Sequence, residues 1–586
     1  MADTMPDVER HTIRTAVPAR LDRLPWSKWH WQVVIGLGTV WILDGLEVTI
    51  VGNIAPRLSE AAAGLGVTTA QVTGIAAALY VAGACVGALF FGWLTDRFGR
   101  KKLFMITLAV YLGATAMTAL SFAPWWFFFF RFLTGFGIGG EYAAINSAID
   151  ELIPSAYRGR VDLAINGSFW VGAGVGSLVS VLVLNENFLP ANVGWRVAFG
   201  LGVVFGFVIL LVRRNVPESP RWLFIHGRAE EAERLVDEIE EKARESTGSD
   251  LEEVHQTIEI EPRRSIGFVT IAKTIVANYP RRTVLGLALF IGQAFLYNAI
   301  TFGYASILVA FFKVPSSSTG YYFAIIALGN FLGPLLLGKL FDTVGRRIMI
   351  SSTYALSGVL LYVTAWLFSN GHLAATTMTV CWTVVLFFAS AGASAAYLTV
   401  SEIFPMETRA LAIAFFYAIG TAVGGITGPL LFAKLIATGH EGTVAIGFYI
   451  GAAVMIIGGI VEIALGVKAE GKQLEDIAKP LTAEDAEGDA AAAGATPQRR
   501  QRRPSPRSGY SHGMPVSAPI EPVELSREIG RIEAALDEHG PMDRAQIARA
   551  VGARFWGPGR FPAALREAVR SGHAERLGRS RFGPRR

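Results

Sequence analysis

The sequence predicts an all-α membrane protein in which twelve transmembrane helices form two pseudo-symmetric six-helix bundles, followed by a small soluble domain. Two observations carry this prediction. The 586 residues are 52% hydrophobic and only 17% charged, with a mean hydropathy of +0.40, a balance that a soluble domain of this length does not sustain. The charged stretch at residues 92–102 recurs at residues 338–348, which indicates two related halves joined head to tail.

Apolar runs long enough to cross ~30 Å of hydrocarbon define the expected spans. These runs are residues 31–52, 71–94, 103–122, 125–148, 161–184, 194–212, 284–312, 319–341, 348–368, 373–399, 409–437 and 444–467. Lys and Arg gather on alternate connections, so the positive-inside rule predicts a multi-pass plasma (inner) membrane protein with both termini cytoplasmic. Cys85 and Cys381 lie inside spans of different halves. We therefore expect no disulfide between them.

The chain divides into six expected segments. A cytoplasmic segment (1–30) precedes the first bundle (31–212), and the second bundle occupies 284–467. The connecting segment 213–283 has amphipathic helical spacing at 229–243 and is expected to be either a solvated linker or a helical latch. Residues 468–522 are rich in Ala, Pro, Ser, Gly and Arg, which predicts a disordered linker.

The last segment, 523–586, is a small basic domain. Its apolar spacing predicts helices at 524–539, 543–551 and 562–571, followed by a hairpin within 572–583. Three helices and a hairpin resemble a winged-helix domain, although a strict motif is absent. We expect this domain to bind a protein, with nucleic acid as the less favoured partner.

A second repeat follows the fourth and tenth spans, where Glu, Pro and Arg recur at the same spacing, as Glu151, Pro154 and Arg158 and as Glu402, Pro405 and Arg409. Over about residues 30–467 the paired motifs resemble the major facilitator superfamily of secondary transporters, and within it the sugar porters and their metabolite-transporting relatives. The resemblance implies a cytoplasmic charge network, or latch, that breaks during alternating access. Its expected members are Asp96, Arg97, Arg100, Glu141, Glu151, Arg158, Asp342, Arg346, Glu402 and Arg409.

Two other interpretations of these charges remain open. The paired stretches at 92–102 and 338–348 would also serve as plain topology anchors. Glu141, near the end of the fourth span, would either join the latch or contact the substrate.

The resemblance also implies a substrate site between the halves. Gln293, Asn298 and Tyr397 stand where sugar porters carry residues that bind sugar, while Gly292 replaces one of the family's two glutamines. We therefore expect a site of porter-like plan and altered lining, in which Asn166, Gln293, Asn298 and Tyr397 bind the substrate. Asp44, Glu47 and Arg131 are expected to line the same cavity.

Ionisable groups inside spans are costly in hydrocarbon and are therefore functional candidates. Asp44 and Glu47 share a helix face, at a depth similar to that of Arg131. The resemblance of residues 45–47 to the proton site of sugar porters implies that Glu47 is the proton site. Because a nearby guanidinium lowers the pKa of a buried carboxylate, we hypothesise that Asp44 assists Glu47 and that Arg131 gates release of the proton. A static ion pair between the first and fourth spans is the alternative.

The predicted function is proton-coupled symport of a small polar solute, with a sugar or sugar-like metabolite favoured. Organic acids, including aromatic acids, are the alternative substrates, because two carboxylates beside one buried arginine also suit a carboxylate ligand. A transporter-like receptor that signals through its C-terminal domain is the alternative of another class. No nucleophile constellation, nucleotide loop or metal-ligand spacing appears in the sequence, so we expect no enzyme, cofactor or metal, and the expected partners are the solute, protons and the lipid bilayer.

Overall fold

The computed structural model describes residues 13–213, 218–225, 228–247, 251, 258–260, 273, 275–404, 409–467, 522–551, 560–571, 573–577 and 581–584, without every side chain. It comprises two compact units, Met1–Thr496 and Pro497–Arg586. Each unit has a hydrophobic core of its own. The expected disordered linker at 468–522 lies almost entirely outside the described residues.

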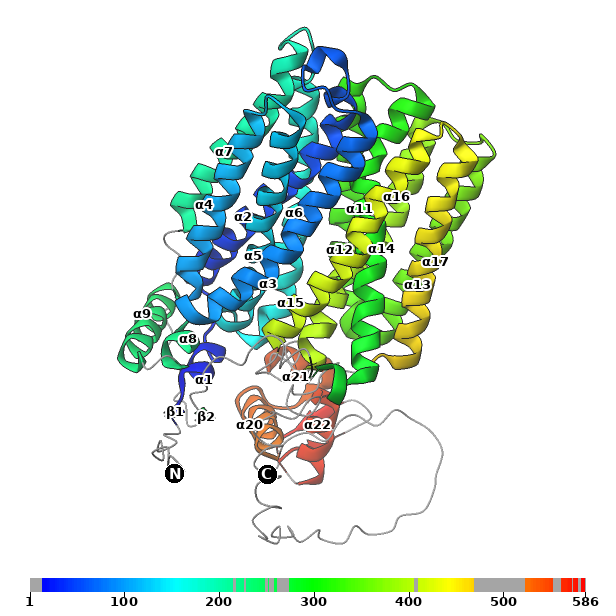
Figure 1. Ribbon diagram of the computed structural model, residues 1–586. Helices are drawn as coiled ribbons and strands as arrows, with labels where there is room; N and C mark the ends of the chain where they lie inside the picture. The colour runs from blue at the N-terminus through cyan, green and yellow to red at the C-terminus, as the bar shows by residue number, and fades with distance from the viewer. Residues whose placement is uncertain are drawn as a thin grey trace, which may run out of the picture. The chain divides into compact units, whose positions relative to one another are not determined.

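The first half of the large unit is a bundle of long helices that closely follow the predicted spans. They are α2 (Lys28–Leu58), α3 (Ala77–Phe98), α4 (Arg100–Ala119), α5 (Pro124–Leu152), α6 (Ser155–Val183) and α7 (Ala191–Arg213). A π-helical turn, Gln71–Ala76, leads directly into α3. Within the bundle α2 packs along α6 and α3 packs along α5 (Figure 1).

The second half repeats this plan. Its helices are α11 (Pro280–Phe312), α12 (Thr319–Thr343), α13 (Arg346–Ser369), α14 (Ala375–Ile403), α15 (Arg409–Gly420), α16 (Ile426–Ala437) and α17 (Glu441–Leu465). A π-helical turn, Thr421–Gly425, joins α15 to α16, so the single span expected at 409–437 contains a local change of winding. Such π-bulges are frequent at functional sites.

The chain is a multi-pass membrane protein. Within the described residues, ten helical segments are long and apolar enough to cross a membrane. The two other long helices in the predicted set are α5 and α7, of which α7 contributes a shorter apolar segment, Ala191–Phe207. The twelve-span count therefore stays a prediction for these two helices.

The two charged repeats adopt the same turn. Gly99 (φ 87°) precedes α4 and Gly345 (φ 109°) precedes α13, and each lies between two long helices. These φ values lie in the region that glycine enters without steric cost. The 92–102 and 338–348 stretches are therefore equivalent in structure as well as in sequence.

Helix crossings in the first bundle depend on glycine. A Cβ placed on Gly45 of α2 would lie 1.9 Å from the carbonyl oxygen of Phe169, and one on Gly172 of α6 would lie 1.8 Å from that of Ile42. The α3–α5 crossing is as tight, because a Cβ on Gly135 would lie 1.9 Å from the Tyr80 oxygen. Small residues permit such close approach in membrane bundles.

The segment between the bundles contains α8 (Pro220–Ile225) and α9 (Ala229–Thr247), which extends the helix expected at 229–243. Its apolar face, with Ala232, Val236, Ile239 and Ala243, is buried in the core of the first bundle. The described helix α9 is therefore packed against the first bundle, while the role of the whole segment 213–283 stays a prediction.

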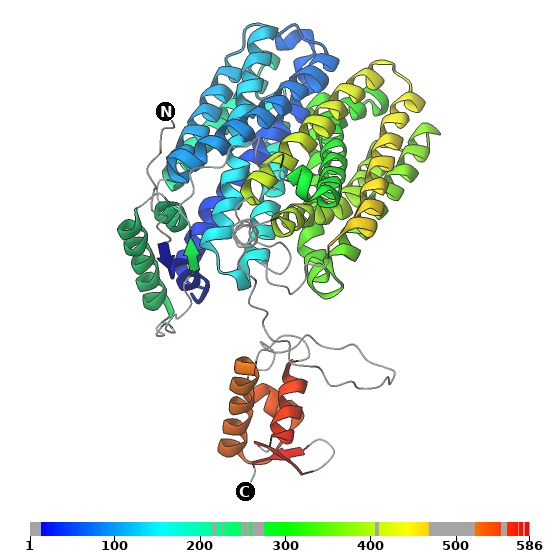
Figure 2. The ribbon, with the colours of Figure 1, turned by 60° about the horizontal axis from the view of Figure 1, so that its bottom comes forward.

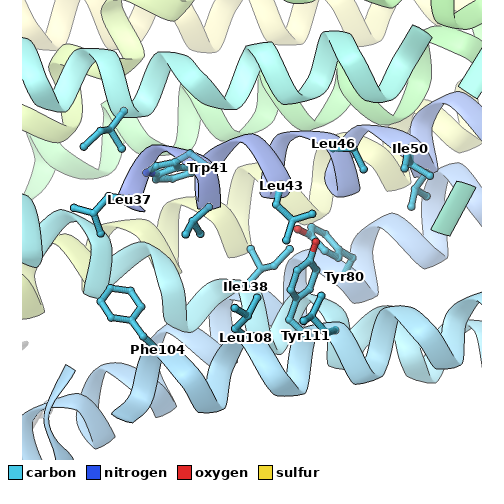
Figure 3. Packing of buried hydrophobic residues seen from close by; sticks show 14 of the residues in the cluster. Leu37, Trp41, Leu43, Leu46, Ile50, Tyr80, Phe104, Leu108, Tyr111 and Ile138 are labelled. Carbon is cyan, nitrogen blue, oxygen red and sulfur yellow. The ribbon is translucent and has the colours of Figure 1, made fainter. Parts of the chain in front are cut away.

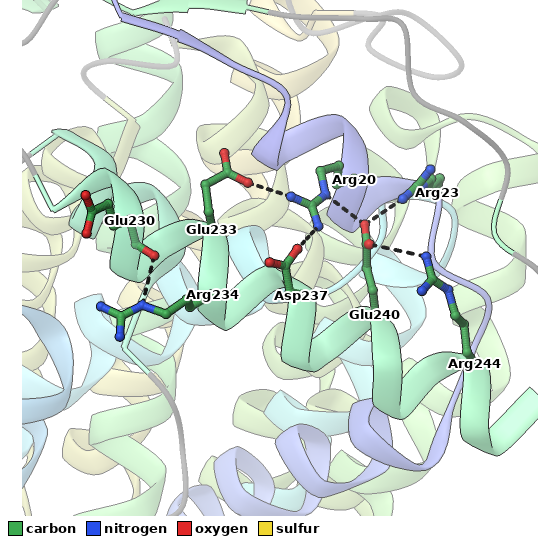
Figure 4. Close-up of polar contacts among 8 residues, drawn as sticks. All are labelled: Arg20, Arg23, Glu230, Glu233, Arg234, Asp237, Glu240 and Arg244. Carbon is green, nitrogen blue, oxygen red and sulfur yellow. Dashed lines mark hydrogen bonds and ion pairs between the residues drawn. The ribbon is translucent and has the colours of Figure 1, made fainter.

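The N-terminal segment is attached to this helix, which the sequence did not predict. Strand β1 (Ile13–Thr15) pairs antiparallel with β2 (Ile258–Ile260), and α1 (Val17–Asp22) follows. Arg20 reaches Glu233 and Asp237 at 2.5 Å and Glu240 at 2.9 Å (Figure 4). Arg23 adds an ion pair of 2.6 Å with Glu240.

The charges of this cluster stabilise one another. Burial opposes the Glu240 carboxylate, but hydrogen bonds from Arg20 and Arg23 outweigh that cost, so the pKa of Glu240 lies below its usual value. The hydrogen bond to Glu240 in turn raises the pKa of Arg20. The pairing is therefore fully charged near neutral pH.

The small unit has the order α20 (Pro522–His539), β3 (Met542–Asp543), α21 (Arg544–Ala550), α22 (Arg560–Arg570), β4 (Glu575–Arg576) and β5 (Arg581–Gly583) (Figure 2). The three expected helices are present, and β4–β5 is the expected hairpin. Strand β3 was not expected, and it pairs with β5, so the sheet order is β3-β5-β4. Ile532, Leu536 and Leu565 lie in its core.

Candidate functional site

A cavity of about 200 Å³ lies between the two bundles of the large unit. Helices α2, α3 and α6 line it from the first half, and α11, α14 and α15 line it from the second. Asn166, Gln293, Asn298 and Tyr397, the four residues expected to bind substrate, all line this one cavity.

The amides of the cavity differ in how far the protein satisfies them. Asn298 donates from Nδ2 to the Ala294 carbonyl oxygen at 2.8 Å, one turn earlier in its own helix. The Gln293 side chain interacts with the Tyr397 hydroxyl. Its buried Oε1 receives no hydrogen bond from the described residues. A buried acceptor of this kind favours a ligand that carries a donor.

Many of the side chains that line the cavity are aromatic. The sequence did not predict this aromatic character. Seven line the cavity: Trp41, Tyr80, Phe169, Trp170, Tyr297, Tyr397 and Tyr417. Trp170 of α6 and Tyr297 of α11 meet across the two halves with ring centroids 5.5 Å apart. The adjacent Phe169 and Trp170 in a glycine-rich span were the sequence feature that could have indicated an aromatic lining. The sequence alone does not show which face of a helix lines the cavity.

Beside the cavity, inside the first bundle, lies a buried ion pair. Arg131 of α5 donates from Nη1 to Glu47 Oε1 of α2 at 3.0 Å, and both side chains are fully buried. Thr115 of α4 donates to the same carboxylate oxygen at 3.3 Å. The predicted contact between the first and fourth spans therefore forms through Glu47.

The other predicted acids are close to this pair. Asp44 and Glu141 are also fully buried, and both lie within electrostatic reach of Tyr80. Asp44, Glu47 and Arg131 do not line the cavity, which differs from the expected arrangement in which all three faced the substrate.

Tyr80 connects the ion pair to the cavity. The guanidinium carbon of Arg131 lies over the Tyr80 ring, 4.6 Å from its centroid. The Tyr80 side chain also lines the cavity. Phe199 lies on another side of the guanidinium at 5.8 Å. Leu43, Leu108 and Ile138 lie in the same hydrophobic cluster as Tyr80 (Figure 3). The pair is shielded from bulk solvent, and Tyr80 is a cation–π neighbour of Arg131 that also lines the cavity.

The expected cytoplasmic latch remains a prediction. Side chains are described for Glu141, which is buried, and for Arg346, which is partly buried. The side chains of Asp96, Arg97, Arg100, Glu151, Arg158, Asp342, Glu402 and Arg409 lie outside the described part of the structure.

At the opposite end of the helices the two halves are joined by polar contacts. Glu60 pairs with Arg57 at 2.5 Å and accepts a hydrogen bond from Ser316 of the second half at 2.8 Å. Arg57 also binds Glu186 at 2.6 Å. This cluster was not expected, because its members are separated by up to 256 residues of sequence.

Two helical bundles around a small central cavity, with ionisable groups buried beside it, define a membrane transporter of small molecules. The chain matches the family described as sugar (and other) transporter over residues 56–480 and belongs to it. This family consists of transporters and not enzymes.

Several curated relatives carry substrates in their names, including niacin, 4-methylmuconolactone, inositol and carnitine. A niacin transporter from Acinetobacter baylyi is 29% identical over 463 residues, which cover 78% of this chain and 99% of that protein. A probable 4-methylmuconolactone transporter from Cupriavidus pinatubonensis is 27% identical over 66% of this chain and 79% of that protein.

Solved structures show the same fold. The proton:xylose symporter XylE bound to 6-bromo-6-deoxy-D-glucose has a TM-score of 0.61 at 17% identity, with 77% of this chain and 98% of that chain covered. A partially occluded inward-open form of the Escherichia coli xylose transporter gives 0.60 at 17% identity, covering 76% and 100%.

Proposed function

We propose that this protein couples proton movement to the transport of a small planar organic acid, with an aromatic ring carboxylate as the best-fitting substrate. The observation that carries the proposal is the lining of the cavity, in which seven aromatic side chains surround about 200 Å³. Aromatic rings pair with one another in offset or edge-to-face geometry, which stabilises a flat ring between them.

Two of the named relatives support a ring-shaped acid as substrate. The niacin transporter matches over nearly its whole length, and niacin is a pyridine carboxylic acid. The 4-methylmuconolactone transporter is named for a small cyclic acid derivative. In the present chain, the Trp170–Tyr297 pair offers an aromatic surface contributed by both halves.

The ion pair supplies a coupling mechanism. When Glu47 takes up a proton its negative charge disappears, and the buried Arg131 guanidinium loses the carboxylate that it binds at 3.0 Å. A substrate carboxylate beyond the Tyr80 ring then becomes the favourable counter-charge. When the anion leaves, Glu47 releases its proton and re-forms the pair, so proton and acid travel together.

A sugar is the second candidate substrate, and a specific observation favours it. Asn166, Gln293 and Asn298 place three amides around the cavity, and amides hydrogen-bond sugar hydroxyls well. In this case the Glu47 proton would travel with a neutral solute, and uptake would carry net charge.

Counterflow in proteoliposomes tests the proposal. Vesicles containing the purified protein are loaded with unlabelled solute and assayed with radiolabelled nicotinate, benzoate, xylose or glucose. We expect exchange of the acids, acceleration of acid uptake by an inward proton gradient, and no exchange of the sugars. Exchange of xylose or glucose without exchange of either acid would establish the sugar candidate instead.

We also propose that the N-terminal and C-terminal segments face the cytoplasm, supported by the basic residues at alternate helix connections. A single cysteine introduced at residue 2 of a variant lacking Cys85 and Cys381 tests this orientation. Labelling of intact cells by an impermeant maleimide would reverse it.

A further inference from the structure

The small C-terminal unit has a specific connectivity. Helix α20 and strand β3 precede two consecutive helices, α21 and α22, and the hairpin β4–β5 follows, with β5 in the centre of the antiparallel sheet. This is the winged-helix arrangement: α21 and α22 occupy the helix-turn-helix positions, and β4–β5 is the wing.

Charge is distributed unevenly over this unit. Helix α20 carries five Asp and Glu residues against two Arg. The remainder, 540–586, carries eleven Arg against three Asp and Glu, without a single Lys. The net positive charge therefore lies in the region that contains α21, α22 and the wing, whereas helix α20 is acidic.

The described arginines of this part point outward. Helix α22 buries Phe561, Leu565 and Ala568 in the core and exposes Arg566 and Arg570, which are one turn apart. Arg570 is 81% exposed and makes only a surface pair with Glu567 of its own helix, at 3.1 Å.

The flanking elements continue this basic surface. Arg544 and Arg549 of α21 are exposed, as are Arg576 of β4 and Arg581 of β5. These four residues lie on the two elements that flank α22 in a helix-turn-helix with a wing.

We propose that this unit binds double-stranded DNA, with the Arg566 and Arg570 face of α22 entering the major groove and the β4–β5 wing lying along the phosphates. Guanidinium groups bind phosphates bidentately and also recognise guanine in the major groove. An anionic membrane surface would attract the same charge, but amphipathic membrane binding also needs exposed apolar residues. Within the described part of this unit, Leu577 is the one large hydrophobic residue that is exposed.

Fluorescence anisotropy with the full-length protein tests this inference. The protein is placed in nanodiscs of zwitterionic lipid and titrated into a fluorescein-labelled 30-base-pair duplex at 50–200 mM salt. We expect saturable binding that weakens steeply with salt, as phosphate contacts require. In the double variant R566A/R570A we expect at least ~10-fold weaker binding and a salt slope smaller by about 2.

R531A is the matched control, because Arg531 is an exposed arginine on the acidic helix α20, and its binding should equal that of the unaltered protein. All three proteins should unfold at the same temperature, since the altered side chains are exposed. Absence of duplex binding, equal binding by R566A/R570A, or binding retained after removal of residues 497–586 would overturn the proposal. Flotation with vesicles containing anionic lipid but no DNA binding would assign the arginines to the membrane instead.

Discussion

The Arg131 guanidinium lies 4.6 Å from the centre of the Tyr80 ring while it donates a 3.0 Å hydrogen bond to Glu47. One face of this arrangement is a buried ion pair, and the other is the wall of the substrate cavity. A single aromatic ring, that of Tyr80, therefore lies between the Glu47–Arg131 pair and the cavity.

The Glu47→Gln variant should lose coupling but retain exchange. Glutamine keeps a hydrogen-bonding oxygen near Arg131 but cannot take up and release a proton. We expect the rate of uptake driven by a proton gradient to fall at least ~10-fold, which corresponds to more than ~1.4 kcal/mol of activation free energy, while counterflow continues. Asp44→Asn, which alters a buried acid of the same helix, should reduce driven uptake less. Driven uptake that stayed proton-dependent in both variants would remove these acids from the coupling mechanism.

Tyr80 should matter through its ring and less through its hydroxyl. Tyr80→Phe keeps the aromatic face beneath Arg131, whereas Tyr80→Leu removes a cation–π contact of about 0.5–2 kcal/mol. We expect the KM of acid counterflow to rise several-fold in Tyr80→Leu and to change less than twofold in Tyr80→Phe. Equal KM values for the two variants would show that the ring does not transmit the charge.

Gly202 of α7 should be sensitive to the smallest substitution. A Cβ at this position would lie 3.0 Å from Glu47 Oε2, so Gly202→Ala pushes on the carboxylate that binds Arg131. Gly200→Ala is the matched control, because a Cβ at Gly200 meets no atom within 4 Å. Proton-driven uptake should fall in Gly202→Ala and stay unchanged in Gly200→Ala. If the two variants transport alike, the carboxylate has room to move without consequence.

The attachment of the N-terminal segment to α9 should depend on pH. Because the folded-state pKa of Glu240 is depressed, its ion pairs stabilise the fold fully above the ordinary carboxylate pKa and are lost as pH falls through the lowered value. Glu240→Gln should therefore lower stability by about 2 kcal/mol at pH 7 and by progressively less towards pH 3. Thermal unfolding followed by circular dichroism measures this difference.

Glu230→Gln is the control for that comparison, since Glu230 is an exposed acid on the same helix. Its unfolding temperature should match that of the unaltered protein at every pH. A pH-independent effect of Glu240→Gln would mean that packing, and not charge, attaches the segment.

Local features of the sequence predict most of the fold, because a membrane restricts both the length and the composition of the helices that cross it. The helix at 229–243, the terminal hairpin and the paired turns at Gly99 and Gly345 all follow from patterns within a few residues. The β1–β2 pairing and the contact of Arg20 with Glu240 do not, since their partners lie more than two hundred residues apart.

For a similar reason, some residues of the candidate site were predicted from the sequence and others were not. Gln293, Asn298 and Tyr397 were found through motifs, and all three line the cavity. Tyr80 and Trp170 were missed because aromatic residues are common in spans, and only packing shows which of them face inward. The geometry also shifts the favoured substrate from a sugar towards a ring-shaped acid.

The close contacts between α2 and α6 at Gly45 and Gly172 limit which substitutions this transporter can accept during evolution. Any amino-acid replacement of a glycine adds at least a Cβ, and at these two positions that carbon would collide with the backbone of the opposite helix. Neither side can accommodate the change by itself. Laboratory evolution towards new substrates should therefore yield variants at the aromatic cavity wall while leaving both glycines intact, so that chemical preference diversifies on an unchanged helix crossing.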